Sequence, residues 1–489
     1  MSCRKQSNRK HKQRRREIQR RKNKTLFQAL VDWLIPEDGL FAKDRFHGNI
    51  KWTPEQLAQQ ALIWAWQDTK NVTDAFERTL EVCRDLKIEK AAQTYTAFIN
   101  ALDRYRPTFS LRLRQHFQFL AEEIGGRFWR DKGWVLLGFD GSRVTTPRTV
   151  SNETAFCAPN YGQGKTAKYR RKKSKGMRRR QNEKNPPEPQ APQVWITMMW
   201  HMGLRLPWTW RLGPSNSSER GHVMEMLKDE EFPEGTLFCG DAGFVGYDFW
   251  TAIVDAGGDF LVRVGANVNL LSETADVKRA GGGLVLCWPK GKMDSGEKPL
   301  RLRLVRVKIG KTQMWMLTSV LDGKKLRPKK IIQYYKMRWG VEVEYRGLKQ
   351  TIDKANLRCR NSARVYAELD WSIRAMAFAE LIALREQLPK SVRRTKPAQD
   401  YDPKDRSLAN TIRALRKCMR TLNQEADPRN DLLSQLAKAL VQKYNNRTNK
   451  KARYRPPNPD KKPLGEPTVT KLTREARERL ARLAKKIAA

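Results

Sequence analysis

Two short apolar runs, each ending in an aspartate, constrain the fold of this chain most strongly. WVLLGFD ends at Asp140, and TLFCGD ends at Asp241. Apolar runs of about four to eight residues bounded by turn residues are typical of buried strands. Further strand-like runs alternate with stretches of helical periodicity. In chain order these segments are residues 194–201, 217–229, 247–256 and 260–264. The alternation predicts an α/β fold with a mixed sheet at its core.

The charge of the chain restricts its partners. Its 489 residues include 97 Lys and Arg against 52 Asp and Glu, which gives a formal net charge of +45. A compact protein with such an excess repels itself, so we expect a polyanion to offset it. Nucleic acid is the first candidate, because basic side chains that neutralise phosphates release counterions. A ribosome-associated protein and a basic membrane-surface protein are the alternatives.

Cysteine usage and hydropathy indicate the compartment. The seven cysteines include no C-x-x-C pair, so neither a zinc ribbon nor a disulfide framework is indicated, and a reducing compartment is favoured. The longest apolar runs fall short of the roughly 20 residues that a membrane span needs. The five histidines lack metal-ligand spacing, and no P-loop or dinucleotide motif is present. We therefore expect a cytoplasmic protein associated with the nucleoid.

Basic and helical segments precede the strand-rich region. Residues 1–24 contain a single acid, Glu17, and such a dense block of like charge predicts a disordered arm that contacts DNA. Residues 25–126 have helical periodicity, and Thr53 followed by Pro54 predicts a capped helix start. We interpret this segment as a helical DNA-binding domain, although simple core packing produces similar apolar stripes.

Two segments interrupt the α/β pattern. Residues 164–193 are very basic and then proline-rich, which predicts a loop or disordered insertion. Residues 265–320 contain three consecutive glycines and alternating strands, which predict a small β insertion. Beyond them the chain ends in a basic C-terminal region, 389–489. Helices are predicted at 327–353, 363–388 and 468–488.

One helical stripe carries the sharpest local motif. Its side chains are Tyr335, Arg338, Glu342 and Lys349. At about 100° per residue, these positions fall on one face of the helix predicted for 327–353, whereas Glu344 points to the opposite face. A carboxylate in such a stripe can hold a metal ion while the guanidinium and the ammonium bind phosphates. A surface helix with ion pairs four residues apart is the alternative.

This stripe resembles the Y-R-E-K signature of the DDE transposases of bacterial insertion sequences. Five other segments resemble the same family in the same order. They are GFDGSRVTTPRTVSNETAF (138–156), GPSNSSERGHVMEML (213–227), GDAGFVGYDFW (240–250), FLVRVGAN (260–267) and MLTSVLD (316–322). The resemblance covers residues 134–385 or so. It implies an RNase H-like core in two parts, 130–264 and 321–388, separated by the β insertion.

The resemblance implies a cut-and-paste transposase in which Asp140, Asp241 and Glu342 are catalytic and hold the metal. Mg²⁺ prefers oxygen ligands, so carboxylates from three separate elements suit it. Two such ions (or Mn²⁺) about 3.5–4 Å apart can activate the attacking water and stabilise the leaving oxygen. Taken alone, an aspartate at a strand end is more often a turn residue. Asp248 is the main rival carboxylate, but it lies in the following helix.

The same resemblance implies the partners. The enzyme would bind double-stranded DNA, both the terminal inverted repeats of its element and the target, as a homodimer on paired ends. The residues expected to contact this DNA are Tyr335, Arg338, Arg346 and Lys349. Three alternatives stay open: a catalytically silent relative that only binds DNA, an RNase H-like nuclease that cuts without joining, and a protein that packs nucleic acid by charge alone.

Overall fold

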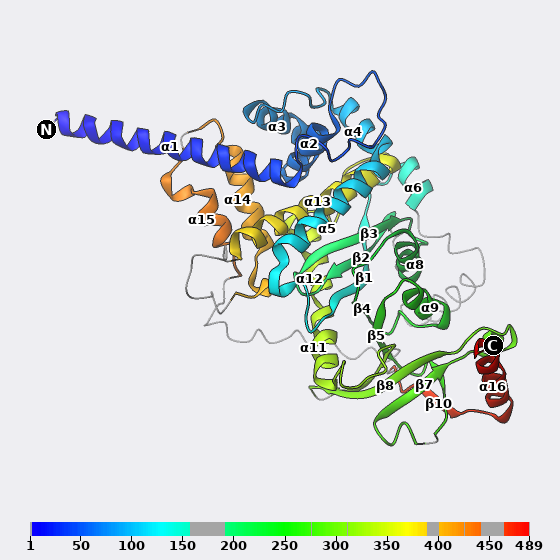
Figure 1. The fold of residues 1–489 in the computed structure, drawn as a ribbon. Helices are drawn as coiled ribbons and strands as arrows, with labels where there is room; N and C mark the ends of the chain where they lie inside the picture. Colours follow the sequence, from blue (N-terminus) through cyan, green and yellow to red (C-terminus); the bar gives the residue numbers. More distant parts are fainter. Residues whose placement is uncertain are drawn as a thin grey trace, which may run out of the picture.

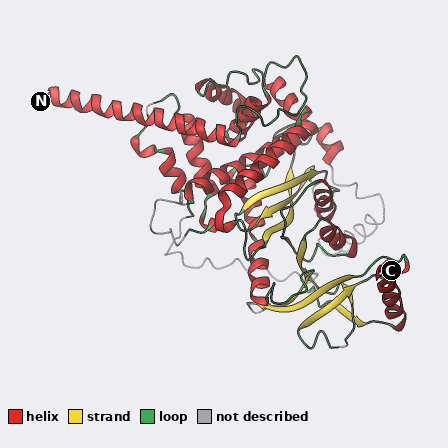
Figure 2. Ribbon diagram, viewed as in Figure 1, coloured by secondary structure: helices red, strands yellow, loops and turns green. Residues whose placement is uncertain are grey.

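A ten-stranded mixed sheet, with helices packed around it, organises the protein (Figures 1 and 2). The computed structural model describes residues 2–156, 191–274, 276–310, 312–388, 401–424, 426–441 and 464–488. Most of the basic loop predicted at 164–193, and parts of the C-terminal region 389–489, lie outside the described residues. The predicted mixed α/β fold class is confirmed.

Five strands form the core of the sheet. They are β1 (Val135–Thr145), β2 (Gln193–His201), β3 (Leu206–Gly213), β4 (Thr236–Gly240) and β5 (Asp259–Val264). Their order is β3-β2-β1-β4-β5; β2 is antiparallel to β1 and β3, whereas β4 and β5 run parallel to β1. This is the RNase H-like arrangement expected from the resemblance. Strand β1 continues five residues past Asp140, where the sequence predicts a strand end, so the carboxyl end of β4 lies beside the middle of β1.

The predicted β insertion continues the same sheet outward from β5. Its strands are β6 (Asn269–Ser272), β7 (Gly282–Cys287), β8 (Leu300–Ile309) and β9 (Thr312–Thr318), with the short helix α10 (Lys290–Asp294) between β7 and β8. Strand β9 pairs with β5, so the insertion is an extension of the core sheet and not a separate unit.

The C-terminal segment adds the outermost strand. The sequence predicts one helix over 468–488, but β10 (Thr468–Lys471) pairs in parallel with β6, and α16 (Arg474–Ala488) begins only after it. Leu472 and Ala476 pack against Leu286 of the insertion. A strand this short depends on its partner, because its edge hydrogen bonds are its main support.

Helices cover both sides of the core strands. On one side lie α8 (Glu219–Asp229) and α9 (Tyr247–Asp255), and on the other lie α5 (Arg106–Gly125), α12 (Gly340–Arg346) and α13 (Ser362–Gln387) (Figure 1). Side chains alternate across a strand. Accordingly, Phe139 packs against Phe244 and Phe249 near α9, while the neighbouring Gly138 faces Arg338.

The predicted helical N-terminal segment forms α1 (Ser2–Leu34), α2 (Pro54–Trp66), α3 (Val72–Asp85), α4 (Tyr95–Arg104) and α5. Thr53 caps α2 by accepting a hydrogen bond from the Gln56 N–H, as its sequence predicts. Trp66 donates its indole N–H to the Ala375 carbonyl of α13 at 2.8 Å. These helices therefore pack directly on the core.

The structure corrects the prediction of a disordered arm over residues 1–24, which belong to α1 from Ser2 onward. The reason is tertiary packing. Asn23 donates to the Asn430 carbonyl at 2.8 Å and accepts from the Leu432 N–H at 3.1 Å, and Lys22 pairs with Asp431 at 2.8 Å. These contacts with the C-terminal region stabilise a helix that its like charges would otherwise destabilise.

The remaining elements connect these layers. They are η1 (Gly126–Phe128), α6 (Val150–Phe156), α11 (Pro328–Arg338), η2 (Gly347–Thr351), η3 (Pro403–Asp405), α14 (Leu408–Arg420), η4 (Pro428–Asn430) and α15 (Leu432–Ala437). None of the described helices is long and apolar enough to cross a membrane. Among the described residues, the free cysteines recorded by the structure are all buried.

Candidate active site

Asp140 and Asp241 lie at matching positions on neighbouring parallel strands. Gly138 of β1 is in register with Cys239 of β4, so two residues further along, Asp140 stands beside Asp241 at the edge where β4 ends. Backbone hydrogen bonds orient both carboxylates: Asp140 accepts from the Gly141 N–H at 2.9 Å, and Asp241 from the Gly243 N–H at 2.7 Å. The fold thus brings together two acids that are far apart in the sequence.

Glu342 comes from a helix that is broken, where the sequence predicts a continuous one over 327–353. Helix α11 ends at Arg338, α12 starts at Gly340, and η2 is a π-helical turn. Gly340, next to the break, packs closely on the sheet: a Cβ added there would lie 1.9 Å from the Trp200 ring of β2. Only glycine allows this approach. Tyr345 then donates to the Asp140 carbonyl at 2.7 Å, which fixes α12 on β1.

Arg338 lies between two of the acids. Its Nη2 is 3.5 Å from Glu342 Oε1, and its Nη1 is 4.0 Å from Asp140 Oδ2. The arginine side chain is only 6% exposed, yet its Nε and Nη1 have no hydrogen-bond partner among the described residues, and neither has Glu342 Oε2. The guanidinium is therefore a loosely held cation that bridges Asp140 and Glu342.

Burial and mutual repulsion raise the pKa values of the acids in this cluster. Burial is the main cause of the raised pKa of Asp140; Asp241 adds to it, while Arg338 and the Gly141 N–H oppose it. Burial likewise raises the pKa of Glu342, against the effect of Arg338. Burial, followed by the charges of Asp140 and Asp241, raises the pKa of Glu219 to about 7. A bound cation would relieve this repulsion.

The donor set suits a hard divalent cation. Carboxylate oxygens are the ligands that Mg²⁺ and Mn²⁺ prefer, and Glu342 Oε2 is a buried oxygen that no described group satisfies. As the side chains stand, no three acids, histidines or cysteines among the described residues are close enough to share one ion. The guanidinium of Arg338 accounts for the spacing between Asp140 and Glu342.

The predicted DNA-contacting residues lie around this cluster. Lys349 donates to Ser142 Oγ at 2.8 Å, two residues beyond Asp140, and burial lowers its pKa. Arg346 is exposed, and Tyr335 is half-buried with its ring 5.8 Å from the Arg338 guanidinium carbon. Arg338 itself is buried among the acids, whereas the sequence predicts a residue that faces a phosphate.

The structure also separates the neighbouring carboxylates. Glu344 is buried on the opposite side of α12, in a cluster with Glu380, Arg205 and Arg406, as its position in the helix predicts. Asp248 lies on α9 and pairs with Lys292 at 2.6 Å. Sequence reasoning treats Glu219 only as part of a helix start; its nearness to Asp140 arises from the packing of α8 on the sheet.

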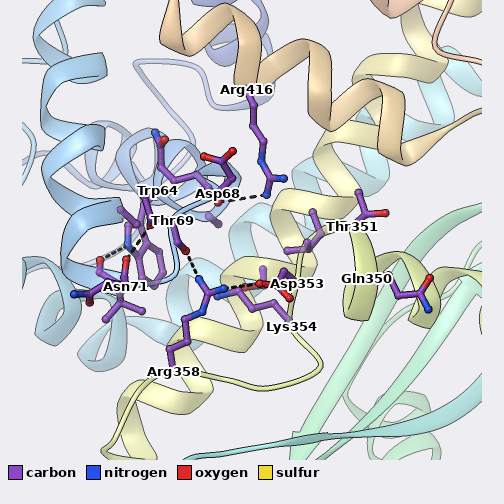
Figure 3. A pocket seen from close by; sticks show the side chains of 16 residues that line it. Trp64, Asp68, Thr69, Asn71, Gln350, Thr351, Asp353, Lys354, Arg358 and Arg416 are labelled. Carbon is purple, nitrogen blue, oxygen red and sulfur yellow. Dashed lines mark hydrogen bonds and ion pairs between the residues drawn. The ribbon is translucent and has the colours of Figure 1, made fainter.

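A polar cavity of about 220 Å³ lies next to the π-helical turn η2, between the α2–α3 loop and the residues after Glu342 (Figure 3). Its charged groups are paired or hydrogen-bonded. Arg358 pairs with Asp353 at 2.6 Å and also bonds the Thr69 carbonyl, and Arg416 donates to the Trp66 carbonyl at 2.7 Å. We interpret this cavity as part of the packing interface between the N-terminal helices and the core.

Part of the chain is similar in sequence to a known protein family. Residues 203–378 match the family model described as "Transposase DDE domain". The chain therefore contains a segment similar to DDE transposase domains, and this segment includes Asp241 and Glu342, while Asp140 precedes it. No curated protein sequence matches the chain.

Solved structures also match the chain. A cryo-EM structure of a piggyBac transposase synaptic complex with hairpin DNA is similar at 14% sequence identity, covering 87% of each chain, with a TM-score of 0.34.

Proposed function

We propose that this protein is a DNA transposase of the DDE type. One observation carries the proposal: Asp140, within β1, stands beside Asp241, the residue after the parallel strand β4, and Arg338 links Asp140 to Glu342. The match of residues 203–378 to the transposase DDE domain and the net charge of +45 support it. A protein that packs nucleic acid by charge alone has no need for buried acids with raised pKa values.

Each side chain in the site has a role in this proposal. Asp140, Asp241 and Glu342 hold the divalent cations, Mg²⁺ or Mn²⁺ and two in number, which when bound supply an activated water and stabilise the leaving oxygen. Lys349 and Arg346 bind backbone phosphates next to the acids, with Tyr335 beside them. Tyr345 keeps Glu342 near Asp140 by anchoring α12 to the backbone of β1.

The finer assignment rests on the sequence. The Y-R-E-K stripe favours the transposases of bacterial insertion sequences, which cut the ends of their element and join them to target DNA. We propose that the protein acts as a homodimer on paired ends, at the terminal inverted repeats of its element, in association with the nucleoid. Inverted repeats that flank the gene, bounded by short direct duplications, would supply the substrate.

Cleavage assays test the catalytic assignment. Purified protein is incubated with Mg²⁺ or Mn²⁺ and duplexes that carry the flanking inverted repeats, and nicking of supercoiled plasmid is followed in parallel. We expect Asp140→Asn, Asp241→Asn and Glu342→Gln each to lower the cleavage rate by about 10³-fold or more, which corresponds to about 4 kcal/mol in the barrier.

Asp248→Asn is the matched control for these variants. Asp248 is a carboxylate in the same segment, 68% exposed and paired with Lys292. It should cleave like the wild type. Cleavage that is absent from the wild type, or unchanged in the three variants, would refute the proposal. A strand-transfer assay with pre-cleaved ends then separates a transposase from a nuclease, because a nuclease gives no joined product.

A further inference from the structure

A strongly basic segment leads to the candidate site along helix α11. Residues 321–338 contain seven Lys and Arg against a single acid, Asp322. Five of the basic side chains are exposed: Lys324, Lys325, Arg327, Lys329 and Lys336. The nearby acids are engaged elsewhere, because Asp131 pairs with Lys330 at 2.7 Å and Asp322 accepts from the Lys324 backbone N–H at 2.7 Å. Among the described residues, none of the five exposed side chains forms an ion pair with an acid, so their charges are available to a partner.

The exposed side chains of α11 form one stripe that ends at the site. Lys329, Gln333 and Lys336 are exposed and lie four and three residues apart, so they share one face of the helix. Ile331 and Tyr334 belong to its buried face. From its start, α11 covers roughly 15 Å to its last residue, which lies between two of the candidate catalytic acids. A rod-like polyanion that follows this stripe would therefore reach the acids.

Helix η1 and the loop after it extend this basic region. Arg127, Arg130 and Lys132 are exposed there. The Lys325 ammonium lies 4.5 Å from the centre of the Trp134 ring, which places the loop beside the turn before α11. A cavity of about 460 Å³ lies between η1, the loop and α11. We call these three side chains, together with the five exposed ones of residues 321–338, the basic surface.

The other face of the core sheet has the opposite charge. Residues 219–236, which include α8, contain six acids and two basic residues. Gly138 of β1 faces Arg338 at the end of α11. Three residues further on, Gly141 faces Glu219 at the start of α8, because side chains alternate across a strand (Figure 1). A polyanion near the acids is therefore attracted to the face of α11 and repelled by the face of α8.

We propose that the basic surface binds the backbone of the target duplex and holds it beside the acids. This inference rests on the proposed function, because joining needs a second DNA at the place where the element end has been cut. The type of side chain indicates which DNA it is. Exposed lysines and arginines on flexible stems contact phosphates, and such contacts carry no information about sequence. A terminal repeat has a fixed sequence that the protein must read, whereas a target duplex can vary.

Charge-neutral variants of the basic surface test this inference. Arg327→Gln, Lys329→Gln and Lys336→Gln are combined in the full-length protein, and binding of a random-sequence duplex of about 30 bp is followed by fluorescence anisotropy over a salt series. If each side chain neutralises one phosphate, the slope of log affinity against log salt should fall in magnitude by about 2 to 3, and the affinity at moderate salt by about tenfold or more. With pre-cleaved ends, joining to a target plasmid should also fall by about tenfold or more, and cleavage of the element ends by much less.

Lys471→Gln, Arg474→Gln and Arg477→Gln, combined in the same way, are the matched control. These side chains are also exposed, but they lie on β10 and α16 at the far end of the sheet (Figure 1). Thermal unfolding establishes that both variants fold. Duplex binding that is equal in the two variants would overturn the inference, and so would an equal loss of cleavage and joining, because the surface would then hold the element end or its flank. A wild type that binds the duplex but neither cleaves nor joins would instead overturn the proposed function, and the target role with it.

Discussion

Two glutamates, Glu342 and Glu368, have very different surroundings in the fold. Glu368 on α13 is fully buried and saturated: it accepts from Lys354 Nζ at 2.7 Å and from the N–H groups of Arg358 and Cys359 at 2.9 Å each. Glu342 is 3.5 Å from Arg338 and has a buried oxygen without a partner. The first acid is satisfied by protein groups, whereas the second keeps an oxygen that no described group satisfies.

The pKa values express the same difference. Burial raises the pKa of both carboxyls, and in Glu342 this effect exceeds that of Arg338. In Glu368 the ammonium of Lys354 and two backbone N–H groups overcome the burial and lower its pKa. Hydrogen bonds to the charged form decide the outcome. The comparison teaches that the hydrogen bonds made to each carboxylate, and not burial alone, separate Glu368 from Glu342.

The largest effect that would test this comparison is expected at Glu368. Glu368→Ala leaves Lys354 buried without a partner and should lower the free energy of unfolding by about 3–5 kcal/mol, measured by urea denaturation at pH 7. Glu342→Ala, measured in the same way, should change it by less than about 1 kcal/mol. Equal losses in the two variants would contradict the distinction between a structural acid and a functional one.

The pH dependence gives the sign of the Glu368 contribution. Because its pKa is lowered in the folded state, the contribution is present above the ordinary value of 4.5 and is lost as the pH falls through the folded value. The stability difference between wild type and Glu368→Gln should therefore be largest near neutral pH and shrink below pH 4.5. A difference that grows on acidification would contradict the lowered pKa.

Much of the site could be predicted from the sequence, because the signals that place Asp140, Asp241 and Glu342 are local. Two apolar runs predict two strands, and periodicity predicts the helix of Glu342. Their convergence follows from strand order, which the family resemblance supplies. The orientation of Glu344 away from the site also follows from helix geometry alone. These inferences need no knowledge of tertiary contacts.

Other features depend on contacts between distant segments and could not be predicted in this way. Gly340, next to the break between α11 and α12, packs against the Trp200 ring of β2. The helix over residues 2–24 is held by partners near Asn430, and β10 forms only beside β6. Periodicity reports which residues prefer burial, but it does not report which segment covers them. Glu219 escapes notice for the same reason.

A smaller effect is expected when Arg338, whose guanidinium lies between Asp140 and Glu342, is replaced by a neutral residue. Arg338→Gln deletes a positive charge that competes with metal between Asp140 and Glu342, so Mn²⁺ should bind the DNA-free protein roughly tenfold more tightly, about 1.4 kcal/mol, in a calorimetric titration. Arg346→Gln, at the exposed arginine that ends α12, is the control and should not tighten binding. Unchanged or weaker Mn²⁺ affinity in Arg338→Gln would show that the guanidinium does not compete with the ion.

The smallest effect concerns Lys349, whose ammonium donates a hydrogen bond to Ser142 on β1. If it neutralises one phosphate, Lys349→Ala should lower the magnitude of the slope of log affinity against log salt by about 0.9 and weaken DNA binding several-fold at moderate salt. Lys228→Ala, an exposed lysine on the outer helix α8, is compared by fluorescence anisotropy with the same duplex. Equal slopes in wild type and Lys349→Ala would mean that this lysine only supports Ser142. The phosphate contact would then have to come from Arg346 or Arg338. DNA would in that case approach the acids from the side of α12.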